Sequence, residues 1–182
     1  MVTTPTELLL LANRDAQDRL GIANATDPWA GSPFEWIRKI PASRTRGKAG
    51  ELLAEAWLIR LGLRVAAASD AGHDRRVAGR KVEIKFSTPW RAAPSQTGSF
   101  RFQQIRDQDY EVALLLGLTP IRAQIWLVPK EELYVHATGQ HGGAQGVVRW
   151  LSFPANAPPK WLQPFGGELE RAEGIVRSWF SA

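Results

Sequence analysis

The chain has 182 residues, no Cys, eight Trp and 44% hydrophobic residues, a composition typical of one folded domain with a real core. The absence of Cys excludes a disulfide scaffold, a Cys-ligated zinc site and thiol catalysis. No apolar run approaches the ~20 residues that span a bilayer, and the N-terminus lacks the basic start of a secretory signal. We therefore expect a cytoplasmic protein.

The formal net charge of +5 is unevenly placed along the chain. Residues 38–106 contain 15 Lys and Arg against 5 Asp and Glu, a net of +10, whereas the remainder has a net of −5. A contiguous basic segment is the expected footprint of a protein that binds a polyanion such as nucleic acid. The alternative is that these side chains are ordinary solvated surface residues.

Three helices are expected in the first third of the chain. One covers residues 6–20, and a short piece lies around residues 35–38 within a connection rich in Pro, Gly and Trp. The strongest helix is predicted over residues 47–63. Its apolar stripe is expected to consist of Leu52, Leu53, Ala56, Trp57, Ile59 and Leu61.

Short strands are predicted to follow, at residues 64–68, 73–78 and 80–87, the last two joined in a tight hairpin through Gly79. The wholly apolar segment 112–118 is typical of a strand covered on both faces, and the remaining predictions are strands at 121–128 and 147–153, a helical turn at 130–133, a glycine-rich loop at 139–146 and a final helix at 168–180. This order predicts a single α/β domain around a mixed sheet, with a core at about 44–135 that residues 1–43 and 136–182 elaborate.

The hairpin brings together the residues that could carry chemistry. If Ala78 and Gly79 are its two turn residues, Asp74 lies opposite Glu83, at a Cβ separation of roughly 4.5–5.5 Å. Lys85 then projects from the same face, which we expect to be the polar, water-facing side of the sheet. Two carboxylates this close repel each other, and either a shared proton or a bound cation relieves that repulsion; a hard divalent cation with oxygen ligands fits this need.

Such an ion would polarise a phosphodiester and lower the pKa of a bound water, while Lys85 would orient that water or stabilise the transition state. The alternative is a surface salt-bridge cluster, which contributes little to stability.

These residues resemble the PD-(D/E)XK phosphodiesterase superfamily, which includes many type II restriction endonucleases and Holliday-junction resolvases. Asp74 matches the first acid, Glu83, Ile84 and Lys85 match the E-x-K half, and His73 stands where the pattern has Pro. The resemblance covers residues 44–129 and implies a restriction-endonuclease-like core, with Mg²⁺, or Mn²⁺ in its place, held by Asp74, Glu83 and Ile84. It also implies a catalytic role for the upstream helical Glu51. Asp70 stays open as a rival to Asp74, and Glu55 as a rival to Glu51.

Several polar residues near this motif are candidates for contact with DNA. The basic residues would bind phosphates, which positions a duplex without reading its sequence, and the segment that follows the catalytic strand is included by resemblance. The candidates are Arg44, Arg46, Lys48, Arg75, Arg76, Gln103, Gln104 and Arg106.

We therefore expect a Mg²⁺-dependent endodeoxyribonuclease that cuts double-stranded DNA and resembles type II restriction endonucleases. A palindromic target would imply a homodimer, and a cognate DNA methyltransferase would be a partner. The alternatives are a Holliday-junction or repair nuclease that recognises DNA shape, and a DNA-binding module without activity.

Overall fold

The computed structural model describes residues 27–90, 98–143 and 146–181. The helix predicted at residues 6–20 lies outside these ranges. No helix in the described residues is long and apolar enough to cross a membrane.

A six-stranded mixed sheet forms the centre of the fold, in the order β1-β2-β3-β5-β6-β9. Its strands are β1 (Val65–Ala67), β2 (Arg75–Val77), β3 (Arg80–Ser87), β5 (Val112–Leu118), β6 (Ala123–Pro129) and β9 (Gly166–Glu168). Neighbouring strands run antiparallel except β3 and β5, which are parallel. The predicted single α/β domain around a mixed sheet is confirmed, and the bounds predicted for β3 and β5 match the structure.

A second, three-stranded antiparallel sheet, in the order β4-β8-β7, packs on one face of the first; the strand predicted at residues 147–153 is its β8, whereas the sheet itself was not predicted. It consists of β4 (Ser99–Ile105), β7 (Thr138–Gly143) and β8 (Gly146–Pro154). The prediction of a glycine-rich loop at residues 139–146 is wrong, because much of that segment forms β7 and pairs with β8. Residues 99–106 were not predicted as a strand because Gln and Arg side chains make most of this segment polar. The alternation of Phe100 and Phe102 with polar residues is nevertheless the pattern of a half-buried strand, as found in β4.

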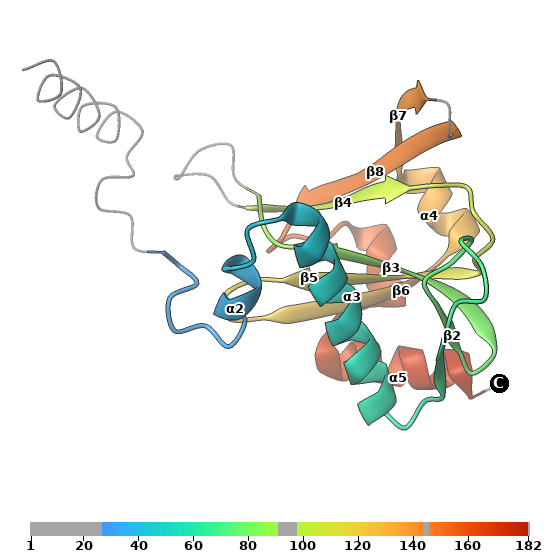
Figure 1. The fold of residues 1–182 in the computed structure, drawn as a ribbon, viewed down its shortest axis with the longest axis horizontal. Helices are drawn as coiled ribbons and strands as arrows, with labels where there is room; N and C mark the ends of the chain where they lie inside the picture. Colours follow the sequence, from blue (N-terminus) through green and yellow to red (C-terminus); the bar gives the residue numbers. More distant parts are fainter. Residues whose placement is uncertain (1–26, 91–97, 144–145, 182) are drawn as a thin grey trace, which may run out of the picture.

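Helices α2 (Glu35–Arg38), α3 (Ser43–Arg60) and α5 (Leu169–Phe180) cover the other face of the central sheet (Figure 1). Helix α4 (Lys130–His136) and the 3₁₀ helix η1 (Lys160–Phe165) lie on the side of the second sheet. The short helix around 35–38 and the final helix are confirmed, and α4 is longer than the predicted single turn.

Strand β5 divides the interior into two cores by the alternation of its side chains. Leu114 and Leu116 face the helices, whereas Ala113 and Leu115 face the second sheet. On that second side, Phe100, Trp126 and Phe153 form an aromatic cluster with ring centroids 5.4–6.2 Å apart. The central sheet is therefore covered on both faces.

Helix α3 contacts the sheet through smaller residues than expected, since Ala49, Gly50, Ala54 and Leu58 are its buried positions. The predicted stripe is wrong at Leu52, Ala56 and Ile59, which are exposed. A Cβ atom on Gly50 would lie only 2.1 Å from Cγ of Phe86 in β3. Because α3 lies so close to β3, only small side chains fit at most of the contact positions. The larger Leu52 and Ile59 lie on the exposed side of the helix.

Candidate active site

The β2–β3 hairpin has the predicted register. Val77 pairs with Arg80, and the pairing extends to Arg75 and Val82. The turn residues Ala78 and Gly79 have φ of +48° and +91°, which is the signature of a type I′ turn whose twist matches that of the strands. This turn fixes which side chains face one another at the far end of the hairpin.

Asp74 stands just before β2, at the point where β3 loses its strand partner on that side. Its Oδ2 accepts a hydrogen bond of 2.8 Å from the backbone N–H of Ile84. The carboxylate thus accepts the hydrogen bond that the carbonyl of a neighbouring strand would otherwise accept. Beyond Val82, no residue of β2 pairs with this edge of β3, and Asp74 lies beside it.

Glu83 and Lys85 project from the same face of β3, and Nζ of Lys85 lies 2.6 Å from Oε1 of Glu83. The expectation that this face meets water is wrong for Glu83, whose side chain is only 8% exposed, while that of Lys85 is 19% exposed. The physical reason is that this face of the sheet is the one the second sheet covers. The three side chains do come together, but at the rim of a core and not on an open surface.

Burial raises the pKa of the Glu83 carboxyl, and the negative charge of Asp74 raises this pKa further. The ammonium of Lys85 opposes both effects without overcoming them, so the pKa of Glu83 lies above its usual value. The charge of Asp74 therefore disfavours the ionised form of Glu83 beside it, which is the situation that a bound cation relieves.

The residues present fit a hard divalent cation. Within residues 27–90, 98–143 and 146–181, no cluster of three or more Asp, Glu or His side chains is placed to hold a metal. Mg²⁺, however, is commonly held by one or two carboxylates, with waters and substrate phosphate completing its shell. Asp74 and Glu83 supply the carboxylates. The carbonyl of Ile84 points to the same strand edge as its N–H, and so to the side of Asp74.

The acids that rival or support this pair have other contacts. Oδ1 of Asp70 accepts the N–H of Gly72 at 2.8 Å in the loop before the hairpin. Glu55 accepts two hydrogen bonds from Arg75 and ties α3 to β2. Glu51 forms an ion pair of 2.8 Å with Lys48, one turn earlier in α3.

The candidates for DNA contact fall into two groups. The first group has intramolecular partners. Arg46 donates to the carbonyls of Ile40 and Pro41, and Lys48 pairs with Glu51. Arg75 donates to Glu55, and Arg76 donates to the carbonyl of Gly79. Arg44, Gln103 and Gln104 are exposed, and Arg106 is half-buried.

Gln103 and Gln104 form a bulge in β4, where the register with β8 shifts between Phe102 and Ile105. Gln104 has φ of +56°, a conformation that is uncommon for a residue with a Cβ. Bulges next to functional sites re-aim side chains, and both amides are turned to solvent here.

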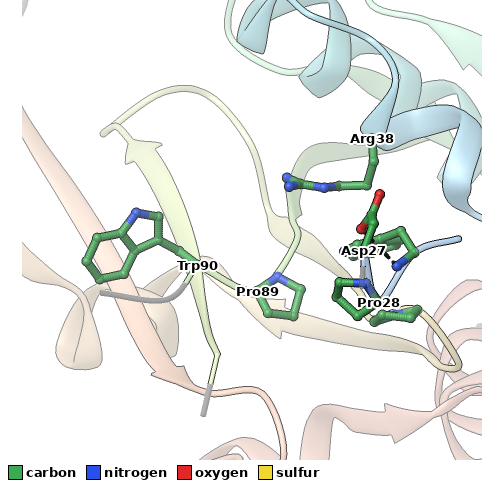
Figure 2. Close-up of a pocket in the computed structure, with 7 residues that line it drawn as sticks. Asp27, Pro28, Arg38, Pro89 and Trp90 are labelled. Carbon is green, nitrogen blue, oxygen red and sulfur yellow. Dashed lines mark hydrogen bonds between the residues drawn. The ribbon is translucent and has the colours of Figure 1, made fainter. Parts of the chain in front are cut away.

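Sequence reasoning missed a cleft at the carboxyl end of β3. One part, of about 350 Å³, is lined by Asp27, Pro28, Trp29, Arg38, Pro89, Trp90 and Pro120 (Figure 2). A second part, of about 300 Å³, shares Arg38, Pro89 and Trp90 and continues to Arg101 and the start of α3. No spacing rule links these segments, because tertiary packing alone brings them together.

No family model and no curated protein matches this chain in sequence. Among solved structures, a bacterial homing endonuclease matches with 13% sequence identity and a TM-score of 0.49. The match covers 77% of this chain and 94% of that one. The likeness concerns the arrangement of the backbone.

Proposed function

We propose that this protein is a metal-dependent endodeoxyribonuclease. One observation carries the proposal. Asp74 and Glu83 are held side by side at the open edge of β3, with the ammonium of Lys85 on Glu83. The strongly basic segment around this site supports a polyanionic substrate.

Each residue has a role in this proposal. Asp74, Glu83 and the carbonyl of Ile84 would hold Mg²⁺ or Mn²⁺, which supplies Lewis acidity and lowers the pKa of a bound water. Lys85 would orient the attacking water and offset negative charge on the phosphoryl oxygens. The water would lose one proton to solvent as its oxygen bonds to phosphorus, one ester P–O bond would break, and the departing sugar oxygen would take a proton from solvent, so that the net reaction is hydrolysis of one ester bond.

The finer assignment is also a proposal. The E-x-K strand, the hairpin acid and the preceding helix with Glu51 favour the PD-(D/E)XK superfamily and a type II restriction endonuclease. In this reading Glu51 would leave Lys48 and support the metal site, the enzyme would act as a homodimer on a palindrome, and a DNA methyltransferase would protect the host sequence.

A second candidate is a nuclease that recognises DNA structure, such as a junction or repair nuclease. The observation that favours it is the cleft beside the site, whose Trp and Pro lining suits unpaired nucleotides better than a stacked duplex.

The test is cleavage of supercoiled plasmid with Mg²⁺ or Mn²⁺ by the wild type and by Glu83→Gln and Lys85→Ala. We expect both substitutions to abolish cutting while DNA binding is retained. Lys81→Ala is the matched control, because Lys81 lies on the same strand and face but pairs with Asp109. Loss of cutting in the control, or full activity in Glu83→Gln, would refute the proposal.

Discrete fragments from a mixed-sequence substrate would assign a restriction enzyme, whereas selective cutting of branched DNA would assign the second candidate. Binding of DNA with no cutting under any metal would leave a non-catalytic module.

A further inference from the structure

The cleft beside the candidate site, which we call the Arg38 cleft, has two parts that share Arg38, Pro89 and Trp90 and differ in their other lining residues. One part is lined mainly by aromatic and prolyl side chains, which are Trp29, Trp90, Pro28, Pro89 and Pro120, together with Asp27 and Arg38 (Figure 2). Among the described residues that line this part, Asp27 is the one with an acidic side chain. Its Oδ1 accepts a hydrogen bond of 3.0 Å from the backbone N–H of Trp29. This carboxylate is therefore committed to the local turn.

The other part is cationic. It is lined by Arg38, Arg46 and Arg101, and among the described residues no Asp or Glu lines it. The guanidinium of Arg46 is occupied by the carbonyls of Ile40 and Pro41. Arg38 and Arg101 instead lie over the rings of Trp29 and Trp90, 5.8 Å and 3.5 Å from the centroids. A guanidinium on an aromatic face keeps its N–H groups free for an anion.

The first turn of α3 adds to this positive part. Ser43 and Gly47 line the cleft, and Ala42 at the N-cap offers no side-chain cap to the free N–H groups. Those N–H groups and the helix dipole favour a negative charge at this point.

The Arg38 cleft adjoins the candidate active site along β3. Phe86 and Ser87 line it, and they directly follow Lys85. With a rise of about 3.3 Å per residue, the cleft begins roughly 3 Å beyond Lys85, at Phe86, and reaches Ser87 roughly 7 Å beyond it. A DNA strand whose phosphate lies at Asp74 and Glu83 would therefore bring a neighbouring nucleotide to the cleft.

We propose that the Arg38 cleft binds one unpaired nucleotide of the DNA substrate, with its phosphate at Arg38 and Arg101 and its base against Trp90. The proposal rests on the proposed function and specifies the part of the substrate that flanks the cut. The volumes of the two parts suit a ligand of nucleotide size. Arg101 covers one face of the Trp90 ring, and Trp90 is still 47% exposed, so the base would stack on the part of the ring that Arg101 leaves uncovered.

The test is equilibrium binding, by fluorescence anisotropy in the presence of a chelator, to three labelled probes of one sequence. They are a perfect duplex, a duplex with one unpaired central nucleotide, and the same duplex with that nucleotide abasic. We expect the unpaired base to improve affinity over the abasic probe by roughly five- to 150-fold, the range expected for base stacking on an aromatic side chain.

Two pairs of variants isolate the cleft. Trp90→Ala should remove the preference for the unpaired base, whereas Trp36→Ala should retain it, because Trp36 is 50% exposed and lies outside the cleft lining. Arg101→Gln should reduce the slope of log K against log salt by about 0.7–0.9 for one lost phosphate contact. Arg60→Gln, at the opposite end of α3, should leave that slope unchanged.

Equal affinity for the unpaired and abasic probes, or equal effects of Trp90→Ala and Trp36→Ala, would overturn the proposal. A free deoxynucleoside monophosphate that displaces the probe with equal affinity would overturn it too, because the cleft would then serve a free nucleotide. If the preference holds but no metal supports cutting, the proposed nuclease activity fails while the binding site stands.

Discussion

The ion pair between Glu83 and Lys85 gives the sharpest test of the site electrostatics. Replacing Lys85 by Met removes the ammonium and leaves Glu83 beside Asp74, with the Glu83 side chain only 8% exposed. The Lys85 side chain is 19% exposed, so Glu83→Gln leaves a cation that reaches water. We therefore expect the two substitutions to have unequal effects on stability.

Breaking a buried ion pair on one side costs roughly 3–5 kcal/mol, and partial exposure of Lys85 places this pair toward the lower end. At pH 8 we expect Lys85→Met to lower the free energy of unfolding by about 3 kcal/mol and Glu83→Gln by about 1 kcal/mol. The double variant should be no less stable than Lys85→Met alone, which gives a coupling energy of at least about 1 kcal/mol.

The effect of Lys85→Met should depend on pH. In the folded protein the pKa of Glu83 is already raised, by burial first and by Asp74 second, and removal of Lys85 raises this pKa further. A carboxyl whose pKa is higher in the folded than in the unfolded chain destabilises above its folded pKa, and the penalty disappears as the pH falls through that value.

Urea unfolding followed by Trp fluorescence, at pH 8 and over a series of decreasing pH values, measures these differences. Equal losses for both single variants, a coupling energy near zero, or a penalty for Lys85→Met that stays constant across the whole series would refute the placement of a charged Glu83 beside Asp74.

Three further predictions concern packing, metal and pH. Gly50→Ala should destabilise by about 1–3 kcal/mol in thermal unfolding, because the new Cβ would lie 2.1 Å from Phe86, whereas Gly47→Ala in the same helix meets no atom within 4 Å and should stabilise by up to about 1 kcal/mol. Millimolar Mg²⁺ should raise the melting temperature of the wild type and not that of an Asp74→Asn/Glu83→Gln variant. A ligand that binds only the folded state stabilises that state. Equal shifts in melting temperature would argue against this site. The rate of DNA cleavage should decrease as the pH falls through the raised pKa of Glu83. A higher Mg²⁺ concentration should shift this decrease to lower pH, because protons and metal compete for the carboxylate. A decrease at the same pH for every Mg²⁺ concentration would contradict the assignment.

The hairpin could be predicted from the sequence because its signals are local. Alternation over residues 81–86 defines β3, and Gly79 after Ala78 defines the turn, so that strand bounds and register follow from neighbours in the chain. The meeting of Asp74, Glu83 and Lys85 is a consequence of that register. The apolar segment 112–118 was equally clear, since a strand covered on both faces has no polar side.

Features that depend on distant packing could not be predicted in this way. The contact face of α3 is set by close approach at Gly50, and no periodicity reveals which of several apolar stripes meets the sheet. The burial of Glu83 depends on the second sheet, whose strands β4 and β8 lie far apart in the sequence. The Arg38 cleft joins α2, α3 and the end of β3 for the same reason.

The candidate site exists because β2 is short and begins only at Arg75. Strand pairing on that side of β3 stops at Val82, and the N–H of Ile84 is satisfied by the Asp74 carboxylate and not by another strand. A longer β2 would close this edge, and a slip of one residue in the turn would move Asp74 to the opposite face, because side chains alternate along a strand. The hydrogen bond that completes the edge of the sheet is thus the same bond that holds the first acid beside Glu83, so the local fold and the proposed chemistry depend on one interaction.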